Sequence, residues 1–383
     1  MSIKEINKLT VKYHNKTVGY LAQLKNSRIA FQYDKEWLIN GFSISPLFLP
    51  LSNKIYINEK IIFGGLYGVF NDSLPEGWGE LLLKRTLHKK GINFDKLTPL
   101  QKLSIIHKGS LGALEYEPNY DLDNSEPNYD LDEIAKESNK IFEDKDINID
   151  LDRVYNLGGS SGGSRPKIHI KYQGEEWIIK FPCHIDPKNI GEKEYRANQL
   201  ASKCGIDVNE FKLFPSKICK GYFGAKRFDR NKNEKIHMIS LAALLETTHR
   251  IPNLDYGHLF QMIEKICVDK NDLYEAFRRM CFNVFYKNKD DHSKNFAFLY
   301  DEAIKGYRLS PAYDITSVPN KSEHEMTVNG NGNPTEQDLL VIADSFKLSK
   351  KRCLDIIANI KTTLKNEYLH FSNGVNSQSK FRF

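Results

Sequence analysis

Apolar and polar residues alternate in three short runs near the start of the chain, at residues 10–13, 18–22 and 28–33. A period of two is typical of strands with one buried face, and turn residues separate the runs. The pattern predicts an antiparallel sheet, followed by a helix with Trp78 on its apolar face. Residues 1–115 are therefore expected to form an α+β subdomain.

The rest of the chain changes from a strand pattern to a helix pattern. Residues 167–171 and 176–180 read as a hairpin, whereas apolar residues in 259–266 recur every three or four positions. We predict a kinase-like fold of two lobes, with a β-rich N-lobe at 147–228 and an all-α C-lobe at 229–383. Nucleotide chemistry is expected at their junction.

Between these parts, residues 116–146 are predicted to be an acidic linker. The segment contains a tandem duplication with a period of nine residues, in which Glu-Pro-Asn-Tyr-Asp-Leu-Asp occurs at 117–123 and again at 126–132. Proline and acidic residues favour a surface loop. An acidic docking segment for a basic partner is the alternative.

Composition narrows the class of protein. The 383 residues carry a net charge of +6, which is typical of a solvated surface rather than of a nucleic-acid-binding face. Six cysteines without a C-x-x-C pair indicate neither a disulfide framework nor a zinc ribbon. The chain has no apolar run of membrane-spanning length and no signal peptide, so we expect a soluble, cytoplasmic protein without membrane contact.

The strongest chemical signal lies at residues 289–295, Lys-Asp-Asp-His-Ser-Lys-Asn. Asp290 stands five residues before Asn295, and Asp314 follows nineteen residues later. In protein kinases an aspartate accepts the proton of the attacking hydroxyl, an asparagine five positions on holds Mg²⁺, and a later aspartate holds the metal at the phosphates. Asp290, Asn295 and Asp314 match these roles, while the neighbouring Asp291 is expected to matter less.

Two other interpretations of this motif are open to test. Asp, Asn, Ser and Lys are common turn residues, so the segment could be a polar turn. His292 suggests a metal-dependent nuclease, but no second histidine stands at ligand spacing. An Asp, Asn and Asp set supplies hard oxygen ligands and favours Mg²⁺.

A glycine-rich loop precedes the predicted hairpin and is a candidate for phosphate binding. Small residues allow backbone N–H groups to approach phosphate oxygens closely. The loop does not match a Walker A motif, because Ser164 follows its last glycine. A purely structural turn is the alternative. The candidate ATP contacts in the loop are Gly158, Gly159, Ser160, Ser161, Gly162 and Gly163.

Lys180 ends the second hairpin strand, where a kinase lysine reaches the nucleotide phosphates and pairs with a helical glutamate. Glu194 is the expected partner and Glu192 a less favoured one. The backbone near Lys226 and Phe228 could hold adenine as a kinase hinge does. An edge strand with ordinary surface charges is the alternative, because it would show the same sequence pattern.

These motifs together resemble the HipA family of bacterial serine/threonine kinases, the toxins of HipBA-type toxin–antitoxin pairs. The resemblance covers most of the chain and preserves motif order. The motifs are Phe70-Asn71-Asp72-Ser73-Leu74-Pro75-Glu76-Gly77-Trp78-Gly79, Leu111-Gly112-Ala113-Leu114, the glycine-rich loop through Pro166-Lys167, Ile178-Ile179-Lys180-Phe181-Pro182, Arg227-Phe228-Asp229-Arg230, Asp290 to Asn295, and Tyr313-Asp314.

The resemblance implies a fold related to the PI3/4-kinases and a role for each matched residue. Asp290 would be the catalytic aspartate, assisted by Lys180, and Asn295 and Asp314 would bind Mg²⁺. Lys167 would belong to the phosphate loop, with His292 and Lys294 as further contacts to ATP. The residue expected to be autophosphorylated, which would silence the kinase, is Ser160, although Ser161 and Ser164 lie close to it.

The resemblance also implies partners. Family members join a HipB-like antitoxin that does most of the operator DNA reading, and they phosphorylate aminoacyl-tRNA synthetases. The alternative is a catalytically weak co-repressor that acts with a DNA-binding antitoxin. A small-molecule phosphotransferase is a third reading of the same motifs.

Overall fold

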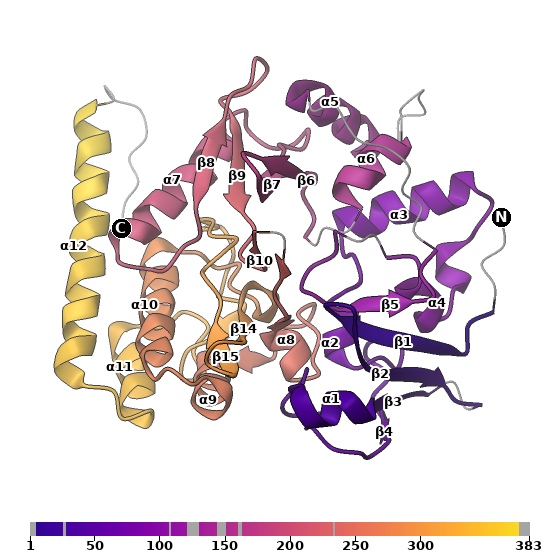
Figure 1. The fold of residues 1–383 in the computed structure, drawn as a ribbon. Coiled ribbons are helices and arrows are strands. Elements are labelled where there is room, and N and C mark those ends of the chain that lie inside the picture. The colour runs from indigo at the N-terminus through magenta and orange to yellow at the C-terminus, as the bar shows by residue number, and fades with distance from the viewer. Residues whose placement is uncertain are drawn as a thin grey trace.

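An antiparallel sheet of five strands forms the base of the N-terminal part (Figure 1). The computed structural model describes residues 5–25, 28–106, 109–120, 130–143, 151–159, 163–232 and 234–374. The sheet order is β4-β3-β2-β1-β5, and the strands are β1 (Lys8–Tyr13), β2 (Lys16–Gln23), β3 (Ile29–Tyr33), β4 (Tyr56–Ile57) and β5 (Glu115–Glu117). Alternate residues of β1 are buried, as the period of two predicts.

Short helices surround this sheet, and the longest of them begins at Trp78. They are α1 (Lys35–Asn40), α2 (Gly68–Asn71), α3 (Trp78–Lys89), the 3₁₀ helix η1 (Phe94–Lys96) and α4 (Pro99–Leu103). Helix α3 buries Trp78 and Leu82 against α6 (Leu151–Gly158), a helix that the sequence pattern did not predict.

The predicted linker at 116–146 is wrong in part, because it contains helix α5 (Leu131–Phe142). The side chain of Asp130 caps this helix by accepting from the N–H groups of Asp132 and Glu133. Ile134 and Ala135 lie in the core beneath the four-stranded sheet. The apolar residues of α5 recur at helical spacing, but the proline and acidic residues of the duplication favoured a loop. Residues 121–129, most of the duplication, lie outside the described residues.

The predicted hairpin is the centre of the second sheet, whose order is β6-β7-β9-β8. Its strands are β6 (Lys167–Tyr172), β7 (Glu175–Lys180), β8 (Phe211–Phe214) and β9 (Tyr222–Lys226), and α7 (Ile190–Lys203) packs on it. Gln173 and Gly174 have φ angles of 52° and 82°. Two successive residues with positive φ make the tight turn that suits a twisted hairpin.

The C-terminal part is helical but not all-α as predicted. The helices are α8 (Leu241–Leu244), α9 (Tyr256–Ile266), α10 (Asn271–Tyr286), α11 (Glu336–Ser345) and α12 (Lys350–Gly374), and Figure 1 shows α12 along one side of the molecule. Among the described residues, no helix is both long and apolar enough to span a membrane.

Short strands interrupt these helices. They are β10 (Arg230–Asn231), β11 (Glu234–Lys235), β12 (Met238–Ser240), β13 (Leu254–Asp255), β14 (Ala297–Asp301), β15 (Gly306–Leu309) and β16 (Met326–Thr327). The sheet β12-β14-β15 matters most, because β14 begins directly after the polar loop at 289–295. Apolar runs this short do not distinguish a strand from a helix by periodicity.

A buried network of charges joins the end of β9 to the N-terminal part. Asp229 accepts from Arg227 (2.7 Å), from Arg230 (2.9 Å) and from the N–H of Gly112 (2.8 Å). Both arginines also donate to the carbonyl of Ser110, at 2.9 and 2.8 Å. Burial alone would raise the pKa of Asp229, but the two arginines outweigh it and hold that pKa well below its usual range.

Replacing Asp229 with Asn should lower the free energy of unfolding by about 3–5 kcal/mol, because two buried arginines lose the buried carboxylate between them and keep only the more exposed Glu176 as a counter-charge. The native pKa of Asp229 lies below the unfolded value of about 3.9, so its contribution is present at neutral pH and fades as the pH falls below about 4. Urea unfolding at pH 7 measures the loss. Asp355→Asn, on the exposed face of α12, is the control. Equal stability of the two variants would contradict the expectation.

Candidate functional site

The loop predicted to carry catalysis connects α10 to β14 through the 3₁₀ helix η2 (Ser293–Asn295). The Nδ2 of Asn295 donates to the carbonyl oxygen of Asp290 (2.8 Å), which closes the loop on itself. The carboxylate of Asp290 is 40% exposed and accepts from the Nζ of Lys321 (2.5 Å). Lys321 also pairs with Glu325 (2.6 Å). Asp290 is therefore accessible to a substrate while a cation holds its position.

Asp291 is the buried anchor of this loop. Its carboxylate accepts from the hydroxyl of Tyr256 (2.8 Å) and from the N–H of Glu325 (3.1 Å), and it contacts Nδ1 of His324 (2.8 Å). Asp291 is 1% exposed. The expectation that this residue matters less for the chemistry stays a prediction, but its contacts have a structural role, since they tie 290–295 to α9 and to the segment before β16.

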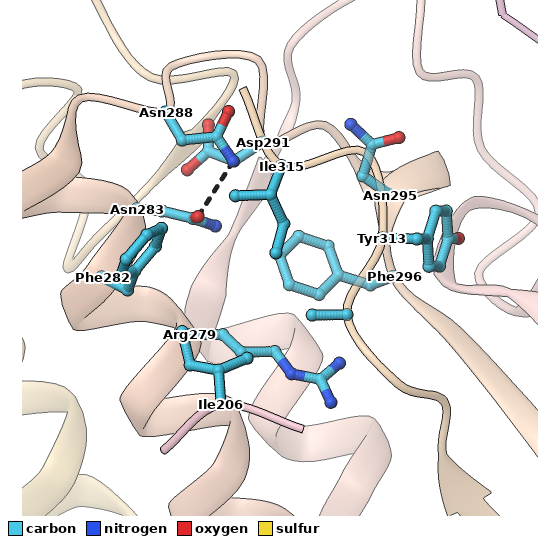
Figure 2. A pocket seen from close by; sticks show the side chains of 11 residues that line it. Ile206, Arg279, Phe282, Asn283, Asn288, Asp291, Asn295, Phe296, Tyr313 and Ile315 are labelled. Atoms are coloured by element: carbon cyan, nitrogen blue, oxygen red, sulfur yellow. Dashed lines mark hydrogen bonds between the residues drawn. The ribbon is translucent and has the colours of Figure 1, made fainter. Parts of the chain in front are cut away.

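Behind the loop lies a small cavity of about 20 Å³ (Figure 2). In Figure 2 the amides of Asn288 and Asn283 meet in a hydrogen bond of 3.0 Å, beside Asp291. The Nη2 of Arg279 and the Oδ1 of Asn288 are buried here without a hydrogen-bonding partner among the described residues. The volume suits one water molecule and is far too small for a nucleotide.

The second part of the site is centred on Lys180 at the end of β7. Its Nζ pairs with Glu194 of α7, as predicted, and lies 2.6 Å from Oδ1 of Asp314. Asp314 has a φ angle of 56°, a left-handed conformation that is uncommon for a non-glycine residue. The lysine therefore connects the four-stranded sheet, α7 and the segment that follows β15.

The charges in this cluster are mutually dependent. Lys180 holds the pKa of Asp314 well below its usual range, although burial acts in the opposite direction. Burial would lower the pKa of Lys180, but Asp314 and Glu194 outweigh it and raise that pKa. Burial raises the pKa of Glu194. The cluster thus keeps Asp314 anionic and Lys180 cationic at neutral pH.

Lys167 lies opposite Lys180 in the register of the hairpin. It is 9% exposed, and burial, followed by the nearby charge of Lys180, lowers its pKa to about 8. A Cβ atom placed on Gly163 would approach Nζ of Lys167 to 2.6 Å. Two lysines and the end of the glycine-rich loop therefore converge on one region.

The glycine-rich loop differs in part from the predicted phosphate loop. Gly158 is the last residue of α6, and a side chain there would meet the carbonyl of Lys167 and the indole of Trp78. The N–H of Gly159 donates to the carbonyl of Tyr155 (2.7 Å). These two glycines pack the helix end rather than form a turn before the strand. The remaining candidates, Ser160, Ser161 and Gly162, lie outside the described residues.

The hinge interpretation stays a prediction, although the backbone groups of Lys226 already have partners in the protein. Its N–H donates to the carbonyl of Glu210 (2.8 Å), and its carbonyl accepts from Nδ2 of Asn209 (2.7 Å). Both backbone groups are thus engaged in the protein. The ring of Phe228 lies 5.1 Å from that of Tyr313, next to Asp314, and so packs near the cluster instead.

Of the two remaining candidates of the polar loop, Lys294 faces the N-terminal part and His292 lies beside His249 of the C-terminal part. Lys294 pairs with Asp72 (2.5 Å) and with Glu76 (3.2 Å), and the rings of His292 and His249 lie 5.0 Å apart. The ammonium of Lys294, predicted to contact nucleotide, is thus committed to two carboxylates of the protein.

Sequence reasoning missed several residues of this site. It quoted Asp72 and Glu76 only as parts of a motif, weighed His324 only as a histidine outside metal-ligand spacing, and did not consider Lys321. Nothing in the pattern of the chain indicates that these residues lie beside 290–295, because the contacts span 31 to 222 positions. Among the described residues, no group of three or more His, Cys, Asp or Glu side chains could hold a metal ion.

Two family models together cover most of the chain. Residues 9–117 match the HipA N-terminal domain, and residues 159–368 match the HipA-like C-terminal domain. The chain belongs to the HipA family. The resemblance stated from the motifs is thereby confirmed.

Individual relatives of this HipA-family chain are distant. HipA of Shewanella oneidensis MR-1, solved as a complex with HipB and operator DNA, has the same fold, with a TM-score of 0.70 and 19% identity over 97% of this chain and 92% of that one. A Haemophilus influenzae protein named "Putative kinase" is 24% identical over 184 residues, which make up 42% of this chain and 53% of the relative. The chain thus matches about half the length of that curated relative.

We expect Lys167 to titrate near pH 8 and Lys180 to remain charged well above that pH. The native pKa of Lys167 lies below its ordinary value of 10.5, so this group alone makes the folded state more stable as the pH rises from about 8 toward 10.5. The ¹³Cε resonance of labelled lysine, assigned with Lys167→Met, measures the titration. A midpoint at the ordinary lysine value would contradict the burial of Lys167.

Proposed function

We propose that this HipA-family chain is an ATP- and Mg²⁺-dependent serine/threonine protein kinase. The observation that carries the proposal is the placement of Lys180 between Glu194 and Asp314. A strand lysine paired with a helical glutamate, beside an aspartate suited to a metal, is the arrangement by which kinases hold nucleotide phosphates. The named Haemophilus influenzae relative is in line with this activity.

The residues present fit a nucleotide with a divalent ion. Asp314 is held as a carboxylate, and the hydrogen bond from Nδ2 of Asn295 to Asp290 leaves the amide Oδ1 as its acceptor atom. Mg²⁺ is commonly held by one or two such oxygen ligands together with phosphate oxygens, so a larger protein cluster is unnecessary. When bound, the ion would neutralise charge on the phosphates. Lys180 and Lys167 would supply the remaining positive charge.

Asp290 would act as the base toward the attacking hydroxyl. Its carboxylate is partly exposed, its backbone is tied to Asn295, and Lys321 fixes its orientation. These contacts favour catalysis by positioning of the attacking hydroxyl and by charge stabilisation, without a covalent enzyme intermediate. The acceptor is proposed to be a protein, an aminoacyl-tRNA synthetase in line with the family resemblance.

The regulatory parts of the proposal follow from the family and from the Shewanella oneidensis complex with HipB and operator DNA. We propose that the chain is a toxin restrained by a HipB-like antitoxin. Operator DNA would be contacted mainly by the antitoxin, which agrees with the mild net charge of +6. Phosphorylation of Ser160 would add about −1.5 to −2 of charge to the loop, which would repel the loop from bound phosphates.

Replacing Asp290 with Asn should slow phosphoryl transfer by at least about 100-fold, because the substrate hydroxyl loses its base. Purified protein with γ-labelled ATP measures self-labelling, and the melting temperature of each variant reports folding. Asp344→Asn, an exposed acid on α11, is the control and should label like the wild type. A wild-type protein that does not label itself, or an Asp290→Asn variant with full activity, would refute the kinase proposal.

The same variant separates the kinase from a catalytically weak co-repressor, the alternative that the Shewanella oneidensis complex favours. For a co-repressor, wild type and Asp290→Asn would bind antitoxin and operator equally, and neither would label itself or another protein. For a kinase, only the wild type would label a protein acceptor.

Replacing Ser160 with Ala should remove most self-labelling while transfer to an added protein acceptor is retained, because the acceptor hydroxyl in the loop is gone. Ser161→Ala and Ser164→Ala are the matched controls, since both serines lie in the same loop. Mass spectrometry of the labelled wild type locates the phosphate. Label on Ser161 or Ser164 instead would show that the site is assigned to the wrong serine.

A further inference from the structure

Residues 72–78 lead from α2 into the first residue of α3. Asp72, at one end of this segment, contacts the polar loop. The carboxylate of Asp72 accepts from the N–H and the hydroxyl of Ser240, at 2.7 and 2.9 Å, and from Nζ of Lys294 at 2.5 Å. Glu76 is the second carboxylate on Lys294 (3.2 Å). The Asp72 and Lys294 side chains are 6% and 15% exposed, so this ion pair is largely shielded from water.

The other end of the segment holds the glycine-rich loop. The N–H of Trp78 donates to the carbonyl of Gly163 (2.8 Å), and its indole N–H donates to the carbonyl of Lys167 (3.0 Å). Gly77 has a φ angle of 53°, and any side chain there would collide with the carbonyl of Gly163. The close approach of the two backbones therefore requires glycine at position 77.

Each contact lands next to residues of the proposed kinase site. Lys294 immediately precedes Asn295, and its carbonyl accepts from the hydroxyl of Tyr313 (2.5 Å), the neighbour of Asp314. Gly163 and Lys167 border the phosphate region. One short segment of the N-terminal subdomain thus contacts both loops, through the ammonium group of Lys294 and through the backbone carbonyl of Gly163.

We propose that residues 72–78 are a positioning element that sets the polar loop 290–295 and the end of the glycine-rich loop relative to each other, so that the N-terminal subdomain is required for efficient phosphoryl transfer. This inference rests on the proposed kinase function. Asp72 and Gly77 are positioning residues, because they act through Lys294 and Gly163 and not on the nucleotide itself.

The two ends of the segment should give different kinetic defects. Asp72→Asn keeps the shape of the side chain but leaves Lys294 with Glu76 alone, so the polar loop shifts and kcat falls by up to about 100-fold with little change in KM for ATP. Gly77→Ala displaces the carbonyl of Gly163 and should chiefly raise KM for ATP. Glu76→Gln, which leaves the Asp72 pair intact, should give a smaller loss of kcat.

Ser73→Ala is the matched control within the segment. The Ser73 hydroxyl bonds to that of Tyr116 (2.8 Å), inside the N-terminal subdomain, and its loss should lower stability without changing kcat or KM. If Asp72→Asn and Gly77→Ala lose activity only in proportion to their unfolded fraction, as a general loss of stability would give, the inference is overturned.

Hydrogen exchange tests the inference without relying on activity. In the full-length protein, amides of 290–296 should exchange faster in Asp72→Asn, and amides of 163–167 should exchange faster in Gly77→Ala. Both regions should be unchanged in Ser73→Ala. Unchanged exchange of 290–296 in Asp72→Asn would overturn the positioning role. If the wild type transfers no phosphate but the two variants show these exchange changes relative to it, the kinase proposal is refuted and the positioning of the two loops by residues 72–78 still stands.

Discussion

The ammonium group of Lys180 is the interaction on which the site depends. It lies partly buried between the carboxylates of Glu194 and Asp314, which come from α7 and from the segment after β15. Removing Lys180 would leave the buried carboxylate of Glu194 without its paired cation, which is strongly destabilising. The lysine consequently holds the four-stranded sheet and the C-terminal part in one relative arrangement. Burial, followed by the charge of Lys180, lowers the pKa of the neighbouring Lys167.

The N-terminal subdomain is joined to the rest of the molecule by more than the chain. One hydrophobic core runs from its sheet into the C-terminal helices, and it includes residues as distant as Leu9 and Ile360. Two polar contacts connect the same parts, the network around Asp229 and the ion pair of Asp72 with Lys294. Apolar burial supplies most of the stabilisation, whereas charged hydrogen bonds, which need a fixed geometry, set the orientation of the N-terminal subdomain relative to the rest of the molecule.

Local patterns predicted those elements whose signals lie within a few residues. The hairpin of β6 and β7 was predictable because Gln173 and Gly174 provide the turn and both strands alternate. Helices α5 and α6 have apolar residues at helical spacing, but they were missed because the proline-rich acidic duplication and the glycine-rich run beside them were interpreted as a linker and a turn. The hinge role near Lys226 stays a prediction. The contacts of its backbone with Glu210 and Asn209 come from a neighbouring segment whose pairing the local pattern does not specify.

By itself the sequence determined the HipA family, the hairpin with Lys180 and the candidate residues Asp290, Asn295 and Asp314, because motif spacing and local periodicity are properties of the chain. Only the tertiary structure decided which charges meet. It paired Lys180 with Asp314 and Lys294 with Asp72, across 134 and 222 positions. It also made Asp291 the buried anchor and left Asp290 exposed. The physical reason is that burial and ion pairing depend on distances in space, which residues far apart in the chain acquire only when the core brings their elements together.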